Sequence, residues 1–287
     1  MTAVVPVFHP RAEPRRAVKR GYPRQAGSVR LCRTLGAVER LLYLRLVDAV
    51  VLDVKAAPEA ALALPARFPR IPMFVLSALR PDDGALLATC HASGFAGLLV
   101  EGVDNAVAGE WIAARTAQVA RRAALAEAPR LLRLTDRLQL AAWEEVLRRV
   151  AVPIKTAQLA AALRVTREHL SRQFAAGGAP NLKRVIDLAR AACAADLLGN
   201  PGYSVRAVVR ILGYASPSHL AGVARRVAPR WPKRHGCCVS PIGCSSRRGR
   251  RSCAASRSPP RRPIWRPRCA SRASTCPASS PRGGRPT

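Results

Sequence analysis

Two stretches of similar pattern decide how the second half of the chain folds. Residues 156–174 read TAQLAAALRVTREHLSRQF, and residues 204–227 read SVRAVVRILGYASPSHLAGVARRV. Each stretch has a run of small and apolar residues at helical spacing, then a short turn, then a second helical run that begins near a hydroxyl side chain. We therefore predict two pairs of helices, each pair joined by a short turn.

The residues around the turns support these boundaries. Thr166 and Ser216 each precede a helical run, and a hydroxyl there can accept a hydrogen bond from one of the first backbone N–H groups of the helix. Gly213 ends the first helix of the second stretch, because glycine adopts a positive φ at little cost. Four apolar residues should anchor the second helices: Leu170, Phe174, Leu220 and Val223.

This packing leaves polar residues facing away from each helix pair. The second helix of each pair can then lie in the major groove of DNA and present its first residues to base edges. A plain helical bundle would not need these outward polar residues. Two units on one chain would reach successive major grooves, about 34 Å apart. The candidate DNA-binding residues are Thr166, Arg167, Glu168, Ser171, Arg172, Ser216, Ser218, His219 and Arg226.

A long helix should join the two pairs. Residues 181–198 repeat apolar residues every three or four positions. Lys183, Arg184 and Arg190 fall on the remaining face, where they either contact DNA phosphates or face solvent.

Residues 138–228 resemble the DNA-binding domain of AraC/XylS-type transcription regulators. The resemblance rests on three motifs in a fixed order: LSRQF at 170–174, LARAACAADLL at 188–198 and GYASPSH at 213–219. The chain departs from the family at Leu220 and Ala224, where an aromatic residue is usual. The resemblance implies an all-α domain with two helix-turn-helix units, double-stranded DNA as the partner, and a sequence-specific bacterial transcription regulator as the function.

Residues 1–126 alternate short apolar runs with helical patterns. The runs at 48–54 and 71–77 are apolar on both faces, as in strands buried between helices. Pro14 and Pro23 weaken any helix between 10 and 24. Five strands that alternate with helices predict an α/β domain with a five-stranded parallel sheet. The expected strands are 3–8, 28–32, 48–54, 71–77 and 95–100, and the expected helices include 35–46, 82–93 and 104–125.

This half resembles a degenerate receiver domain of a response regulator. Asp53 ends the third strand, where receivers carry the phosphoacceptor, and Ser77 ends the fourth, where receivers place a Ser or Thr. Receivers also hold Mg²⁺ with an acidic pair after the first strand and carry a Lys after the fifth, but here His9-Pro10 and Glu101 stand there. Phosphoryl transfer to a carboxylate needs both the metal and a cation. Asp53 is thus a weak phosphoacceptor candidate, and the domain is interpreted as a pseudo-receiver for dimerisation or protein contact.

Residues 127–137 form a linker between the two halves, and residues 229–287 form a tail of different composition. The tail carries fourteen Arg, one Lys and no acid, which makes +15 of the net charge of +31. A segment rich in Arg, Ser, Pro and Cys buries too little apolar surface to offset the entropy of ordering, so we predict disorder. The abrupt change near Ala228 also fits a frameshift in a GC-rich gene.

Composition narrows the partner and the compartment. The remaining charge of +16 still favours a polyanionic partner, nucleic acid first. No apolar run of 18 residues and no signal-peptide pattern occur, so no membrane segment and a cytoplasmic location are expected. Cys32, Cys90 and Cys193 are widely spaced and predict core thiols rather than disulfides.

Three functions compete at this point. The first is the sequence-specific regulator, with a homodimer formed through the N-terminal domain. The second is a non-specific nucleic-acid binder driven by charge. The third is a signalling or dimerisation module with impaired DNA binding. No Gly-rich phosphate loop, nucleophile elbow or metal-spaced His pair occurs, so no enzyme activity, cofactor or metal is expected.

Overall fold

The computed structural model describes residues 3–175 and 178–227, which all belong to one compact unit. The tail at 229–287, with its predicted disorder, its proposed frameshift and six of the nine cysteines, lies outside the described residues. Among the described residues, no helix is both long and apolar enough to cross a membrane.

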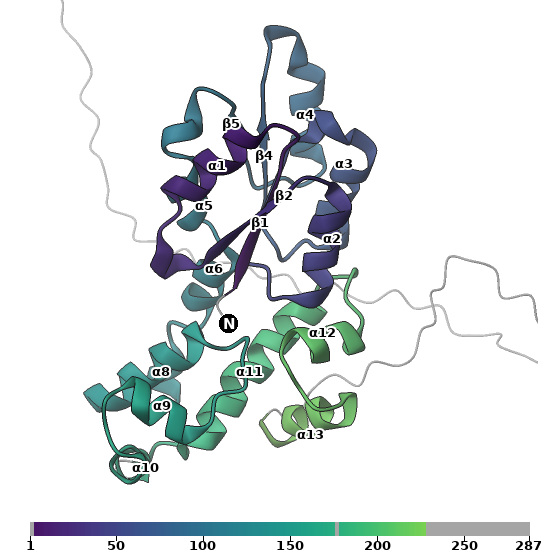
Figure 1. The fold of residues 1–287 in the computed structure, drawn as a ribbon. Coiled ribbons are helices and arrows are strands. Elements are labelled where there is room, and N and C mark those ends of the chain that lie inside the picture. Colours follow the sequence, from purple (N-terminus) through teal and green to yellow (C-terminus); the bar gives the residue numbers. More distant parts are fainter. Residues whose placement is uncertain (1–2, 176–177, 228–287) are drawn as a thin grey trace, which may run out of the picture. The chain divides into compact units, whose positions relative to one another are not determined.

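The N-terminal half is an α/β domain built on a parallel sheet (Figure 1). The strands are β1 (Val4–Phe8), β2 (Ser28–Cys32), β3 (Val50–Leu52), β4 (Met73–Ser77) and β5 (Gly97–Val100). Their order is β2-β1-β3-β4-β5, and each neighbouring pair runs parallel. Flavodoxin-like and receiver domains share this doubly wound order. The predicted five-stranded parallel sheet is therefore confirmed.

Helices cover both faces of this sheet, and the strand residues alternate between two cores. Val50 and Leu52 pack on the side of α2 (Leu35–Leu44) and α3 (Pro58–Arg67). Val51 packs on the opposite side, where α1 (Ala12–Gly21) and α5 (Ala108–Ala113) lie. The remaining elements of this half are α4 (Gly84–Ala92) and the short 3₁₀ turns η1 (Arg24–Ala26), η2 (Val54–Ala56), η3 (Pro81–Asp83) and η4 (Asp104–Ala106).

Two sequence expectations for this half are wrong. The segment 10–24 contains a full helix, because Pro14 lies in the first turn of α1, where its missing N–H breaks no helical hydrogen bond. The segment 104–125 is not one helix. The side chain of Thr116 accepts a hydrogen bond from Val119 N at 3.4 Å and starts a new helix, α6 (Ala117–Ala124).

The C-terminal half of the described chain is helical. Its elements are α7 (Ala128–Leu131), α8 (Arg137–Arg148), α9 (Thr156–Ala162), α10 (Arg167–Ala175), α11 (Leu182–Leu198), α12 (Val205–Ile211) and α13 (Pro217–Val227). The pair α9–α10 shares a core with α8 and the start of α11, which includes Trp143, Phe174 and Val185. The predicted α/β domain followed by an all-helical region is thus the observed architecture.

The second pair, α12–α13, has a different core. Its buried residues Leu212 and Leu220 belong to the same apolar cluster as Leu42 of α2. Aromatic rings extend this cluster, because Tyr203 packs edge to face on Phe68 with a centroid distance of 5.0 Å. The core on the α2 side of the sheet therefore continues into the second helix pair.

Candidate functional site

The first helix pair turns at a residue with left-handed backbone. After α9, Arg164 has a φ of 58°, and Val165 and Thr166 lead into α10. The hydroxyl of Thr166 accepts a hydrogen bond from His169 N at 3.1 Å, as predicted for the cap. Leu170 and Phe174 are fully buried and fix α10 against α8.

The second pair repeats this geometry with a glycine in the turn. Gly213 has a φ of 62°, which confirms its predicted role. The hydroxyl of Ser216 accepts a hydrogen bond from His219 N at 3.0 Å, and Pro217 then occupies the first position of α13. Leu220 and Val223 are buried, as predicted.

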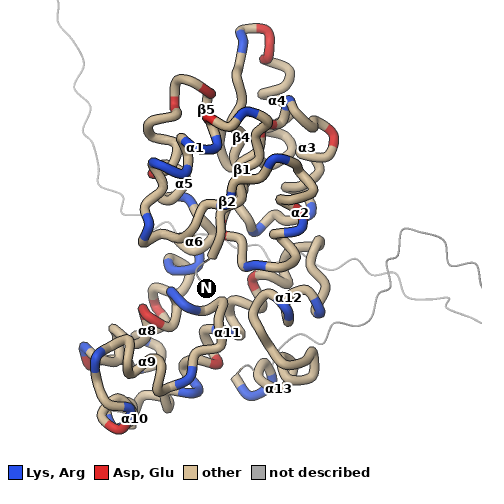
Figure 2. The backbone as a smooth tube through the Cα atoms, in the orientation of Figure 1, with Lys and Arg blue, Asp and Glu red and all other residues tan. Residues whose placement is uncertain are grey.

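The candidate DNA-binding residues lie on the outer sides of α10 and α13. All nine predicted residues except the half-buried Ser216 are exposed. Basic residues occur on both helices (Figure 2). His219 packs edge to face on Tyr214 at a centroid distance of 5.6 Å, and Arg226 lies 3.9 Å from Asp187. Their contact with DNA stays a prediction.

Arg190 is not a surface residue, which corrects the expectation that it faces DNA or solvent. It is buried and donates a hydrogen bond to the carbonyl oxygen of Leu212 at 2.6 Å. Its guanidinium also stacks 4.3 Å from the centroid of the Tyr214 ring. Burial raises the pKa of Tyr214 to about 12, so the phenol stays neutral. Arg190 thus holds the turn of the second helix pair, while Lys183 and Arg184 are exposed.

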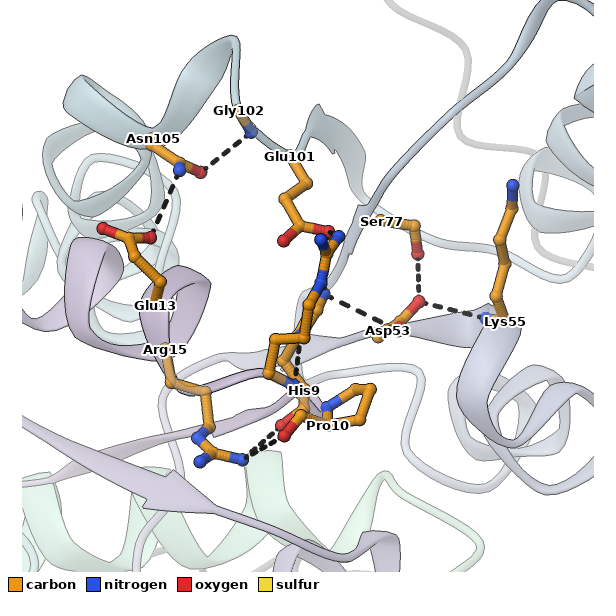
Figure 3. Close-up of polar contacts among 11 residues, drawn as sticks. His9, Pro10, Glu13, Arg15, Asp53, Lys55, Ser77, Glu101, Gly102 and Asn105 are labelled. Carbon is orange, nitrogen blue, oxygen red and sulfur yellow. Dashed lines mark hydrogen bonds and ion pairs between the residues drawn. The ribbon is translucent and has the colours of Figure 1, made fainter.

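A second polar site lies at the carboxyl ends of the strands (Figure 3). His9 follows β1, Asp53 follows β3, Ser77 ends β4 and Glu101 follows β5. In open parallel sheets, ligands bind outside this edge, near the point where the strand order reverses. Asp53 and Ser77 were expected here from the sequence, and the structure brings His9 and Glu101 into the same cluster of polar side chains.

His9 lies between two carboxylates. Its Nε2 is 3.2 Å from Glu101 Oε2 and 3.6 Å from Asp53 Oδ2, although neither contact has the alignment of a hydrogen bond. Its Nδ1 accepts a hydrogen bond from Arg11 N at 3.1 Å. This contact assigns the proton of a neutral imidazole to Nε2, the nitrogen that faces the acids. His9 is 1 % exposed, so this contact is shielded from water.

The other polar groups of this cluster also pair within the protein. Ser77 Oγ donates to Asp53 Oδ1 at 2.5 Å, and Lys55 N donates to the same oxygen at 3.2 Å. The guanidinium of Arg11 pairs with Glu101. The Lys55 ammonium lies 2.5 Å from Asp83 Oδ2. Glu101 and Asp83 are thus each paired with a cation, whereas Asp53 is held by a hydroxyl and a backbone N–H.

This polar cluster does not fit the Mg²⁺ ion that a receiver fold implies. Mg²⁺ prefers carboxylate and water oxygens in octahedral geometry. Here the place of an acidic pair is taken by His9, whose Nε2 lies 3.2 Å from Glu101 Oε2 and 3.6 Å from Asp53 Oδ2. As the protonated nitrogen of a neutral imidazole, this Nε2 offers no lone pair to a metal ion. In the part of the chain that the structure describes, no group of three His, Cys, Asp or Glu residues could hold a metal ion.

The comparisons with known proteins add little to this geometry. No protein-family model and no curated protein matches the chain. One similar solved structure is a response regulator from Thermotoga maritima, at 20% identity and a TM-score of 0.35 over 39% of this chain and 95% of that chain. Another is full-length FixJ from B. japonicum, at 16% identity and a TM-score of 0.34 over 78% and 97%. TM-scores this low carry no argument. The receiver-like class of the N-terminal half therefore rests on its strand order, and the description of the C-terminal half rests on the helices that the structure contains.

Proposed function

We propose that the protein is a sequence-specific DNA-binding transcription regulator of the AraC/XylS type, whose α10 and α13 lie in successive major grooves. One observation carries this proposal. Both helices begin at a hydroxyl cap, are anchored by two buried apolar side chains, and expose polar residues in their first turns. A recognition helix needs this combination of a fixed inner side and an exposed polar N-terminal part.

The exposed residues would divide into two roles. Arg172 and His219 would read base edges, and an arginine that binds a guanine contributes about 1–3 kcal/mol of discrimination. Lys183 and Arg184 are exposed near the start of α11 and would contact phosphates. Their removal should weaken binding to all sequences alike.

Selection from a random duplex pool tests this function. The full chain and residues 1–228 are each selected at about 0.15 M salt, where the Debye length is about 8 Å. We expect both to enrich one shared motif, and Arg172→Ala and His219→Ala to lose it. Arg40→Ala removes an exposed arginine of α2 and should leave the motif unchanged.

Each alternative predicts a different selection result. Strong binding that enriches no motif would replace the proposal with charge-driven, non-specific binding. No binding by a folded chain would leave only a signalling or dimerisation module.

The N-terminal domain is proposed as a pseudo-receiver that works without phosphorylation. Asp53 Oδ2 and Glu101 Oε2 lie at most about 6.8 Å apart, because both are close to one nitrogen of His9. A phosphoryl group on Asp53 would add negative charge beside the carboxylate of Glu101, in a cluster of side chains without a suitable metal site. Incubation with acetyl phosphate and Mg²⁺ should therefore give no phosphate adduct on Asp53 by mass spectrometry. An adduct that Asp53→Asn removes would refute this part.

This domain is also proposed to form the homodimer. Val103 and Val107 flank η4 and are 76% and 54% exposed, so two branched apolar side chains within five residues of sequence face solvent. Light scattering should show a dimer that Val103→Asp with Val107→Asp converts to a monomer. A monomeric unsubstituted chain at micromolar concentration would contradict the dimer.

A further inference from the structure

A basic groove runs along the outer edge of the sheet, away from both sites described above. It lies between α1 and β2, includes η1, and has a volume of about 880 Å³. Its lining includes five cationic residues and no acidic residue. The five are Arg16, Lys19, Arg20, Arg24 and Arg30.

Most of these cations have no partner in the described part of the chain. All five are exposed. Arg20 pairs with Glu13 at 2.8 Å, a contact between two side chains that are both more than half exposed. Arg16 and Lys19 lie on the same side of α1 as Arg20, because residues three and four apart face the same way on a helix. The groove therefore presents a concentrated positive charge, of which the ion pair with Glu13 offsets only the part at Arg20.

The groove also contains the unpaired edge of the sheet. In the described residues β2 pairs only with β1. Ser28 N donates to the carbonyl oxygen of Ala3, so Ser28 and Arg30 direct their backbone groups toward β1. Because direction alternates along a strand, Val29 and Leu31 direct their N–H and C=O groups outward. An extended chain could form a backbone ladder with these groups.

The apolar part of the groove suits a peptide. Val29 packs partly against the core beneath α1, and Leu31 on the same side of the strand is 41% exposed. Arg30 projects from the opposite side of β2, so cations stand on both sides of the edge. A strand paired with β2 would have cations near its side chains on both faces of the sheet. It would also have an apolar contact with Leu31.

We propose that an extended acidic segment of a partner protein binds here as a sixth strand beside β2. Backbone groups would supply part of the affinity, and the cations would select acidic side chains. Duplex DNA would use the charge and the outward N–H donors, but its phosphates offer no donor to the outward C=O groups and no apolar contact to Leu31. The partner strand would match the five residues of β2, about 17 Å of chain. This inference is independent of the proposed DNA binding by α10 and α13.

Hydrogen exchange on the full chain tests the proposal. The probe is the capped heptapeptide Glu-Val-Glu-Val-Glu-Val-Glu, with the corresponding Lys-Val peptide and a 20-base-pair duplex as comparisons. The readout is exchange at the outward amides of Val29 and Leu31, because the basic tail at 229–287 would attract any acidic peptide. We expect the acidic peptide alone to slow these amides by on the order of tenfold or more.

Substitutions separate strand addition from loose attraction. Arg30→Glu should weaken peptide binding by roughly tenfold, which corresponds to about 1.4 kcal/mol. Arg40→Glu makes the same change at an exposed residue of α2 and should have little effect. Leu31→Pro removes an outward N–H without a loss of pairing to β1, so the peptide should no longer slow exchange at the Val29 amide. Leu31→Ala keeps that N–H and should retain the slowed exchange. Circular dichroism verifies that each variant is folded.

Three results would overturn the proposal. Equal effects of Arg30→Glu and Arg40→Glu would show diffuse charge attraction. Protection by the duplex and not by the peptide would make the groove a nucleic-acid surface. Protection by neither would leave the cations only the role of preventing unwanted pairing at the sheet edge.

Discussion

Two equivalent turn positions predict opposite effects of substitution on stability. Gly213 has a φ of 62° and Arg164 a φ of 58°, one in each helix pair. An L-residue in this conformation costs roughly 1–2 kcal/mol. Gly213→Ala adds that cost, and its Cβ would stand 3.1 Å from Pro153 Cδ. The reduced entropy of the unfolded chain offsets roughly 0.4–1 kcal/mol, so we expect a net destabilisation of about 1 kcal/mol.

Arg164→Gly should act in the other direction. It removes the left-handed strain but adds the flexibility of glycine, roughly 0.5–1 kcal/mol. The expected net stabilisation is about 0.5 kcal/mol. Because Arg164 is exposed, the substitution leaves no cavity.

Urea unfolding of the full chain, followed by circular dichroism, measures both effects. Gly222→Ala is the matched control, because Gly222 lies inside α13 without a positive φ and its added Cβ meets only Arg226 Nη1 at 3.8 Å. It should stabilise by up to about 1 kcal/mol. The reasoning is refuted if Gly213→Ala and Arg164→Gly shift the unfolding midpoint in the same direction.

Three further predictions follow from buried groups and close contacts. Burial raises the pKa of Cys193 to about 11, so iodoacetamide at pH 8 should leave this thiol unlabelled in peptide mapping. The stability that the neutral thiol contributes should be lost as pH rises from about 9 through 11. Burial also raises the pKa of Asp48 despite its pairing with Arg121. The stability linked to its protonated form is therefore present below about pH 4 and lost as pH rises through the raised value, and Asp48→Asn should remove this part of the pH dependence of the urea midpoint. A Cβ on Gly109 would stand 2.2 Å from the backbone of Gly21, so Gly109→Ala should destabilise by roughly 3 kcal/mol or more, as measured by the same unfolding assay.

The sheet was largely predictable because buried parallel strands read as continuous apolar runs. The expected strand 28–32 has the observed bounds of β2. The helices were harder to predict where helix-breaking and helix-capping residues occur close together. Pro14 and Pro23 weakened the prediction of α1. The helix α3 was not predicted, because it begins at Pro58 and contains Pro65, and both residues normally argue against a helix.

The site could be predicted only where chain order fixes position. Asp53 and Ser77 were expected at strand ends, and their hydrogen bond confirms that the ends meet. The contact of His9 with both carboxylates depends on the turn after β1, which no local pattern specifies. Arg190 was expected on the exposed face of α11, but its contact with Leu212 depends on how α12 packs on α11, which the sequence of α11 alone does not encode.

The two helix pairs differ in how closely they depend on the N-terminal half. The pair α9–α10 is supported by α8 and α11, whereas the core of α12–α13 is continuous with that of α2 and α3. A backbone hydrogen bond from Gly202 N to Arg67 O, at 2.8 Å, reinforces this second connection. A shift of α2 would therefore reach α12 directly and α13 through α12, whereas α10 packs on α8 and α9. A structural change in the N-terminal domain would therefore move the pair α12–α13 relative to the pair α9–α10.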